Sequence, residues 1–157
     1  MPTIVYLAEH PQHIPTLAAW HHAQWGHLNP AKSLEVRMER LQAELATHLA
    51  QRTIPTTFIA VEGPRVLGSA SLVAHDMDLR PNLTPWLASV FVDPTCRGQG
   101  IGSQLVERVA AEAAALGVAR LYLFTPDRAP LYARLGWQTL EQVEYRGEVE
   151  TVMVREL

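Results

Sequence analysis

A glycine-rich segment in the second half of the chain limits what it can fold into. Residues 90–102 read Val-Phe-Val-Asp-Pro-Thr-Cys-Arg-Gly-Gln-Gly-Ile-Gly, an apolar strand and a turn followed by three spaced glycines. Over residues 100–116, apolar side chains then recur at helical spacing, at Ile101, Leu105, Val109 and Ala113. Glycines at the start of a helix leave its unpaired N–H groups and positive dipole end accessible. The segment therefore predicts a phosphate or pyrophosphate site.

Composition narrows the class of protein. The 157 residues are 48% apolar and 18% charged, which fits one folded domain over residues 1–157. The net charge of −3 argues against nucleic acid as a partner. The single cysteine, Cys96, excludes an internal disulfide and a multi-cysteine metal site. No apolar run approaches the ~18 residues of a membrane span, and residues 1–6 lack the pattern of a secretory signal, so we expect a cytoplasmic location and no membrane partner.

Hydrophobic patterns predict the element order β-α-α-β-β-β-α-β-α-β-β. Strands are expected over residues 3–8, 56–61, 66–73, 86–92, 121–124, 138–143 and 148–154, and helices over residues 13–25, 34–49, 100–116 and 129–135. Gly26 and the Asn29-Pro30 pair should end the first helix, and Ser33 should cap the second. The apolar stripe of that second helix is Leu34, Met38, Leu41, Leu45 and Leu49. The order predicts a mixed α/β (α+β) fold, with a central, mostly antiparallel sheet of about seven strands and helices on both faces.

Two common phosphate-binding motifs do not fit the glycine segment. The Walker A motif requires a lysine after its second glycine, and the only lysine of the chain is Lys32. The Gly-x-Gly-x-x-Gly fingerprint of dinucleotide-binding folds fails because Ser103 or Leu105 stands where its last glycine belongs.

The pattern Arg97-x-x-Gly100-x-Gly102, placed directly after a strand, resembles the Arg/Gln-x-x-Gly-x-Gly/Ala signature of the GNAT superfamily of acetyl-CoA-dependent N-acetyltransferases. Residues 131–137, Leu-Tyr-Ala-Arg-Leu-Gly-Trp, are similar to a second signature of that family, Leu-Tyr-x-x-x-Gly-Phe. The element order fits this family over essentially the whole chain, while the N-terminal half matches in pattern and not in motif.

The resemblance implies that acetyl-CoA is the cosubstrate. Backbone N–H groups of the glycine loop would hold its pyrophosphate, at Arg97, Gly98, Gln99, Gly100, Ile101 and Gly102. Its pantetheine arm would pair with the main chain of Val90, Phe91 and Val92, where one N–H group would polarise the thioester carbonyl. Thr125 stands where the family often has an asparagine that contacts pantetheine.

Tyr132 occupies the position of the family's general acid to the departing sulfur. Its place in the first turn of a short helix predicts a somewhat lowered pKa. Proton transfer from a phenol of pKa ~10 to the thiolate of a thiol of pKa ~8.5 is unfavourable by about 2 kcal/mol of free energy. A hydrogen bond to the thiolate is therefore at least as plausible as complete proton transfer.

The acceptor side has less pronounced signals. Candidate bases for the amine are a water chain or the side chains of Glu62, His75, Asp76 and Asp78. The acceptor pocket should lie where the first two helices meet the cofactor cleft, near His21, His22, Trp25 and His27. Of all these residues, Trp25, His75 and Asp76 are our candidates for contact with the acceptor. No metal is expected, because no His-x-x-x-His pair with a third ligand is present.

These observations predict an N-acetyltransferase that acts on a primary amine of a small molecule or peptide, by direct attack in a ternary complex. Two alternatives stay open: a non-catalytic acyl-CoA-binding or sensing module on the same fold, and an interaction domain whose loop binds no nucleotide. Family members often form homodimers, and the last strands would offer an edge for such a contact.

Overall fold

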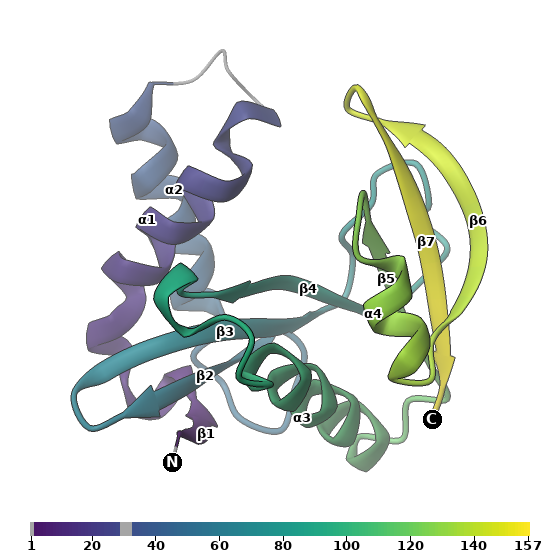
Figure 1. Ribbon diagram of the computed structural model, residues 1–157. Coiled ribbons are helices and arrows are strands. Elements are labelled where there is room, and N and C mark those ends of the chain that lie inside the picture. The colour runs from purple at the N-terminus through teal and green to yellow at the C-terminus, as the bar shows by residue number, and fades with distance from the viewer. Residues whose placement is uncertain (1, 29–32) are drawn as a thin grey trace.

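A computed structural model of the chain describes residues 2–28 and 33–157 (Figure 1). Within these residues, a seven-stranded sheet has the order β1-β2-β3-β4-β5-β7-β6. Its strands are β1 (Thr3–Tyr6), β2 (Thr56–Glu62), β3 (Arg65–Val73), β4 (Trp86–Val92), β5 (Arg120–Thr125), β6 (Gln138–Tyr145) and β7 (Glu148–Glu156). The helices are α1 (Ile14–Trp25), α2 (Leu34–Thr47), α3 (Ile101–Ala115) and α4 (Ala129–Arg134). The predicted order of strands and helices is confirmed.

All neighbouring strands are antiparallel except β4 and β5, which are parallel. The parallel pair arises because α3 carries the chain from the end of β4 back to the start of β5. The mixed, mostly antiparallel sheet predicted from the sequence is therefore confirmed.

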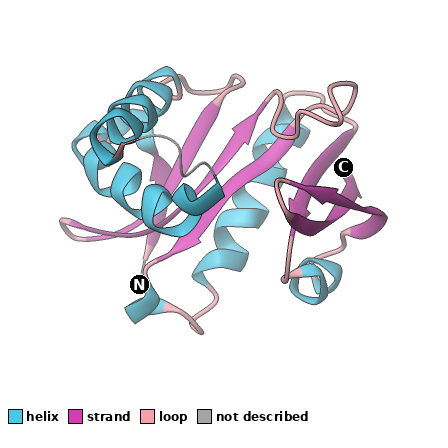
Figure 2. Cartoon of the chain, turned by 90° about the horizontal axis from the view of Figure 1, so that it is seen from above, coloured by secondary structure: helices cyan, strands magenta, loops and turns pink. Residues whose placement is uncertain are grey.

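Helices cover both faces of the sheet (Figure 2). On one face α1 and α2 bury a small core of Leu7, Leu17, Ala18, Leu45, Ile59 and Val66. On the other face α3 packs on the central strands through the predicted positions Ile101, Leu105, Val109 and Ala113, all of them buried. The helix approaches β3 closely at Gly68, where an added Cβ would lie 3.1 Å from Leu105 Cδ1 and 2.7 Å from the Phe91 carbonyl oxygen.

Two predictions near the N-terminus need correction. The first strand ends at Tyr6 and not at Ala8, because Tyr6 is the last residue paired with β2 and a 3-10 turn (Leu7–Glu9) directs Leu7 into the core. Leu34 is 57% exposed, because the first turn of α2 extends beyond the apolar face that buries Leu45. Ser33 caps α2 as predicted, since its Oγ accepts a hydrogen bond from Val36 N at 3.3 Å. The predicted helix stop at Asn29-Pro30 lies outside the described residues.

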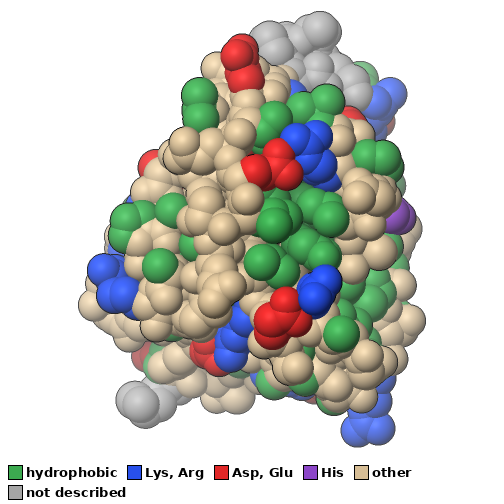
Figure 3. All heavy atoms as spheres, turned by 90° about the vertical axis from the view of Figure 1, so that its right-hand side faces the viewer, with side chains coloured by type: hydrophobic (Ala, Val, Ile, Leu, Met, Phe, Trp, Pro, Cys, Tyr) green, Lys and Arg blue, Asp and Glu red, His purple; other side chains and the backbone are tan. Residues whose placement is uncertain are grey.

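The β6–β7 side of the molecule carries apolar side chains among charged ones (Figure 3). Leu140 on β6 and Val149 on β7 are exposed apolar residues of this strand pair. The homodimer expected at the last strands stays a prediction. Across residues 2–28 and 33–157, no helix is both long enough and apolar enough to span a bilayer.

Candidate active site

The parallel strands β4 and β5 separate soon after they meet. Their only paired residues are Trp86 and Tyr122, beside a bond from Tyr122 N to the Pro85 carbonyl at 3.1 Å. Beyond this point a cleft of about 920 Å³ opens between the two strands and continues toward α1 and α2. Figure 1 shows β5, β6 and β7 turned away from the first four strands. The divergence exposes main-chain groups in the middle of the sheet.

A β-bulge adds to this exposure on β4. On β3, Ser69 pairs with Phe91 and Ser71 pairs with Ala88. Two β4 residues, Ser89 and Val90, therefore lie opposite the single β3 residue between the two serines. Ser89 adopts a φ of 54°, in the left-handed region. Val90, Phe91 and Val92 line the cleft, where their backbone can pair with an extended ligand.

The glycine loop presents the N-terminus of α3 to the same cleft. Gly100 is the N-cap with φ 80°, and the first intrahelical bond runs from Gln104 N to the Gly100 carbonyl at 3.0 Å. The amides of Ile101, Gly102 and Ser103 precede that bond and belong to residues that line the cleft. A Cβ on Gly98 or Gly100 would have no heavy atom within 4 Å, so the space before these amides is open. This arrangement suits a phosphate group.

Three further candidates for cofactor binding have different surroundings. The Arg97 side chain folds back on β4, where its Nε donates to the Val92 carbonyl at 3.0 Å and its guanidinium lies over the Phe91 ring. Gln99 is exposed and does not line the cleft. Thr125 lines the cleft, and its Oγ1 accepts a hydrogen bond from Arg128 N at 3.0 Å, which shapes the turn into α4.

Tyr132 lies on α4 at the wall of the cleft and is 8% exposed. Its ring packs edge-on against Trp137 with the centroids 6.2 Å apart. Burial raises the pKa of Tyr132 to about 12, while the charge of Arg128 opposes the rise and that of Asp127 adds to it. The expected lowering of the pKa is wrong, because desolvation outweighs the dipole of a six-residue helix.

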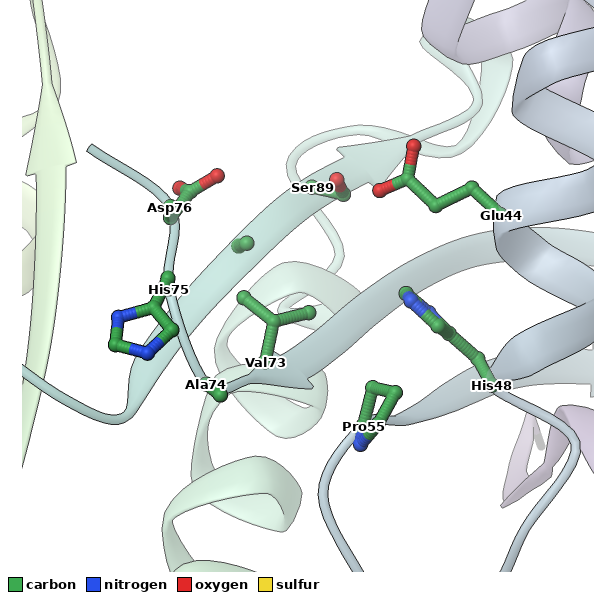
Figure 4. A pocket seen from close by; sticks show the side chains of 9 residues that line it. Glu44, His48, Pro55, Val73, Ala74, His75, Asp76 and Ser89 are labelled. Atoms are coloured by element: carbon green, nitrogen blue, oxygen red, sulfur yellow. The ribbon is translucent and has the colours of Figure 1, made fainter. Parts of the chain in front are cut away.

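On the acceptor side, Asp76 and Glu44 lie on either side of Ser89 (Figure 4). Both carboxylates line the cleft and also a smaller adjoining pocket of about 310 Å³. Desolvation, followed by the charge of Glu44, raises the pKa of Asp76 to about 7. Water in the open cleft still reaches Asp76.

The other candidate bases are less well placed. His75 lines only the smaller pocket, with its ring turned away from Glu44 and His48 (Figure 4). Asp78 is ion-paired with Arg146 at 3.2 Å. Glu62 is exposed at the end of β2 and does not line the cleft.

Glu150 on β7 is a cleft residue that the sequence analysis did not identify. It is 3% exposed, and its Oε2 has no hydrogen-bond partner among the described residues. Desolvation raises its pKa to about 7, with further contributions from the neighbouring Glu148 and from Asp127.

Two buried histidines, His21 and His48, line the cleft and contact hydroxyl groups of the sheet. His21 Nε2 lies 3.2 Å from Ser69 Oγ, and His48 Nδ1 lies 2.8 Å from Thr57 Oγ1. Burial lowers the pKa of His21 to about 4, so this ring is neutral at physiological pH. Trp25 lines the cleft and packs edge-on against both His21 and Phe91. Across the described part of the chain, no group of three potential ligands is arranged to hold a metal ion.

We expect the Glu150→Gln variant to be more stable than the wild type at alkaline pH. Below its ordinary pKa near 4.5, the Glu150 carboxyl group is neutral in both the folded and the unfolded protein. As pH rises from 4.5, the group ionises more readily in the unfolded protein, which destabilises the fold, and this destabilisation is complete above pH 7. Because Glu150 lies at the wall of an open cleft, we put the gain at about 2 kcal/mol near pH 8.5 and well under about 1 kcal/mol near pH 5.

Chemical denaturation at the two pH values measures this difference. Glu144→Gln is the matched control, because Glu144 is exposed on β6 and does not line the cleft. The titration of His21 lowers the stability of wild type and variant alike as pH falls toward 4, so it cancels in the comparison. An equal effect of Glu150→Gln at both pH values would contradict the raised pKa.

Comparisons with known proteins agree with this geometry. The sequence model of the acetyltransferase (GNAT) family matches residues 14–137. No curated protein matches the chain significantly. An acetyltransferase from Streptococcus agalactiae has a TM-score of 0.71 and 19% identity, over 99% of this chain and 98% of that one. An aminoglycoside 6'-N-acetyltransferase complexed with coenzyme A has a TM-score of 0.76 and 14% identity, over 98% and 96% of the two chains.

A protein from Salmonella typhimurium, whose structure was solved with its cofactor acetyl-CoA, has a TM-score of 0.68 and 18% identity, over 100% and 94% of the two chains. At such identities these neighbours establish the fold alone. The family match covers most of the chain and includes both the glycine loop and Tyr132. The chain therefore belongs to the acetyltransferase (GNAT) family.

Proposed function

We propose that this protein transfers the acetyl group of acetyl-CoA to a primary amine of a small-molecule or peptide acceptor, by direct attack in a ternary complex. The divergence of β4 from β5 after a single paired position carries this proposal. It opens one continuous cleft from the glycine loop, past the bulged main chain of β4, to the carboxylates beside α2.

The cleft offers a place for each part of the cofactor. The diphosphate would accept hydrogen bonds from the amides of Ile101, Gly102 and Ser103 at the start of α3. The pantetheine arm would pair with the main chain of Val90–Val92, as an added strand does at a free edge. The sulfur would then lie near Tyr132 on the opposite wall.

The acetyl transfer requires a neutral amine. A primary amine of pKa ~10.4 is only ~0.05% neutral at pH 7, a cost of about 4–5 kcal/mol. We assign Asp76 to accept the ammonium proton, directly or through water in the cleft. The amine nitrogen then attacks the thioester carbon, a main-chain N–H group of β4 stabilises the oxyanion, and the C–S bond breaks as coenzyme A leaves.

The departing thiolate would accept a hydrogen bond from Tyr132. With its pKa raised to about 12, the phenol holds its proton more tightly than coenzyme A does, so donation without complete transfer is favoured. The attacking nitrogen loses its second proton to water in the cleft, and water returns a proton to the thiolate, so the neutral amide and coenzyme A leave while Asp76 passes the first proton to solvent.

Thiol release from acetyl-CoA with a panel of primary amines tests the function. We expect turnover and initial-rate lines that intersect, as a ternary complex requires. Parallel lines together with an acetylated enzyme would contradict direct attack. A thermal shift with acetyl-CoA, which is worth about 2.7 kcal/mol at 100-fold excess over Kd, reports binding independently of turnover. A shift without turnover on any amine would favour the acyl-CoA-binding module, and no shift would favour the interaction domain.

A further inference from the structure

Glu150 is a buried carboxylate whose Oε2 has no hydrogen-bond partner among the described residues, while a side-chain hydrogen bond with Glu148 contributes to its raised pKa. Its residue is 3% exposed on β7. Burial of an uncompensated carboxylate is costly, and proteins rarely keep one unless a ligand or a reaction uses it. Glu150 contributes to the lining of the cleft, so its missing partner can come from a molecule bound there.

The acidic groups around Glu150 add to the need for a positive partner. Glu148 precedes it on β7, Asp127 follows β5, and Asp76 faces it from the segment after β3. Beyond Asp76 lies Glu44 on α2, so carboxylates occupy both walls of this part of the cleft. Among the described residues, Glu44, Asp76 and Glu150 form no ion pair.

The cationic side chains near Glu150 contact other groups. Arg146 pairs with Asp78 and covers the Tyr145 ring, although its charge lowers the pKa of Asp76 in part. His27 lies 3.5 Å from Glu148. Arg97 contacts β4 beside the glycine loop, and Arg128 lies next to Asp127 before α4.

Two more arginines line the cleft from α2. Arg37 donates to the Gly26 carbonyl, and Arg40 is exposed one helical turn before Glu44. The carboxylates between β7 and α2 therefore keep an excess of negative charge.

This excess selects the charge of the acceptor. An ammonium group placed between the two walls would supply hydrogen-bond donors to Glu150 Oε2 and relieve the repulsion among the carboxylates. A carboxylate on the acceptor would add to that repulsion. A single ammonium cannot serve here, because the reacting nitrogen must become neutral and leave the charge uncompensated.

Resting on the proposed function, we infer that the acceptor belongs to the polyamine class: a primary amine that carries at least one further ammonium group, which the carboxylate of Glu150 binds while Asp76 faces the reacting nitrogen. Alkyl polyamines and polycationic aminosugars share this chemistry. Glu150 is thus a specificity residue, distinct from the groups at the thioester.

The test compares acceptors that differ in the second charge. Putrescine, the nearly isosteric monoamine pentylamine and the zwitterion γ-aminobutyrate are assayed for thiol release, with an aminoglycoside as a separate arm that distinguishes the two sources of polycation. We expect kcat/KM for putrescine or for the aminoglycoside to exceed that for pentylamine by about 30-fold, with γ-aminobutyrate poorest. Equal values for monoamine and polyamines, or a preference for γ-aminobutyrate, would overturn the inference.

Glu150→Gln ties the preference to this residue. We expect the variant to lose about 30-fold in kcat/KM for the preferred polyamine and less than about threefold for pentylamine. Glu144→Gln is the matched control and should change neither value. The thermal shift with acetyl-CoA should persist in both variants, which shows that each is folded and binds the cofactor. An equal loss on the monoamine and the polyamine would show that Glu150 has no role in selecting the second charge.

Calorimetric titration of each polyamine into the complex with coenzyme A needs no turnover. Binding that Glu150→Gln weakens would uphold the inference even where acetyl transfer fails, and absence of such binding would overturn it even where transfer to monoamines succeeds. Failure of the proposed function and failure of this inference are therefore distinguishable.

Discussion

Replacing Tyr132 with phenylalanine should lower kcat by about 100- to 1000-fold and leave KM for acetyl-CoA within about threefold. The ring is buried against Trp137, so phenylalanine keeps the packing and removes only the hydroxyl. No hydrogen bond of the described residues uses this hydroxyl, which leaves it available to the sulfur. The loss should therefore appear when charge develops on the leaving group and not when the cofactor binds.

The pH dependence of kcat separates a hydrogen bond from titration of the phenol. Because burial raises the pKa of Tyr132 to about 12, the hydroxyl stays protonated throughout an assay range that ends near pH 10. If the phenol titrated within that range, wild-type kcat would change with pH and Tyr132→Phe would lack this change. We expect no such difference between the two pH profiles. Tyr122→Phe is the matched control. Tyr122 lies on β5, packs against Trp86 of β4 and does not line the cleft. Activity of Tyr132→Phe within twofold of wild type would remove the residue from the mechanism.

Replacing Gly100 with aspartate should weaken acetyl-CoA binding by at least about 100-fold. Gly100 holds a φ of 80° at the N-cap of α3, and a side chain there enters open space before the helix amides. Aspartate tolerates this backbone region better than most residues and can cap a helix, so the variant should fold. Its carboxylate would occupy the N–H groups and repel the diphosphate.

Gly100→Asn separates charge from bulk. Asparagine has nearly the same shape and tolerates the same φ, but it carries no charge. We expect it to weaken binding by only about 5- to 10-fold. Titration calorimetry with coenzyme A measures both variants, and chemical denaturation checks that each remains folded. Unchanged affinity in Gly100→Asp would place the diphosphate away from this loop.

The glycine loop and the strand before it, which we propose to hold the cofactor, could be predicted as structure from the sequence because they are built from local backbone. Glycines 98, 100 and 102 follow a strand and open a helix, and both elements are short-range patterns. The predicted bounds of β4 match the structure, and the predicted face of α3 is the buried one. A backbone position with a positive φ favours glycine, so this local geometry can be recognised from the residue types alone.

The carboxylates that we propose for the acceptor side come together through contacts between distant segments. Glu44, Asp76 and Glu150 come from α2, from the segment after β3 and from β7, and only folding brings them to one cleft. The sequence did hold an indication of Glu150: it lies two residues before Val152 on the same face of β7, where a buried carboxylate is unusual. His48 had no comparable signal, because it directly follows α2 and only the packing of this helix end on β2 brings its Nδ1 within 2.8 Å of Thr57 Oγ1.

The sequence by itself thus determined the order of the elements and the loop that suits a diphosphate, since periodicity, glycine placement and capping act over a few residues. It also determined the family, through the residue types of two motifs. The tertiary structure alone decided where β1 ends, that Leu34 is exposed, and that the pKa of Tyr132 rises instead of falling. It also decided which carboxylates line the cleft. Burial and electrostatic repulsion depend on what surrounds a group in space, and residues far apart in the chain supply those surroundings.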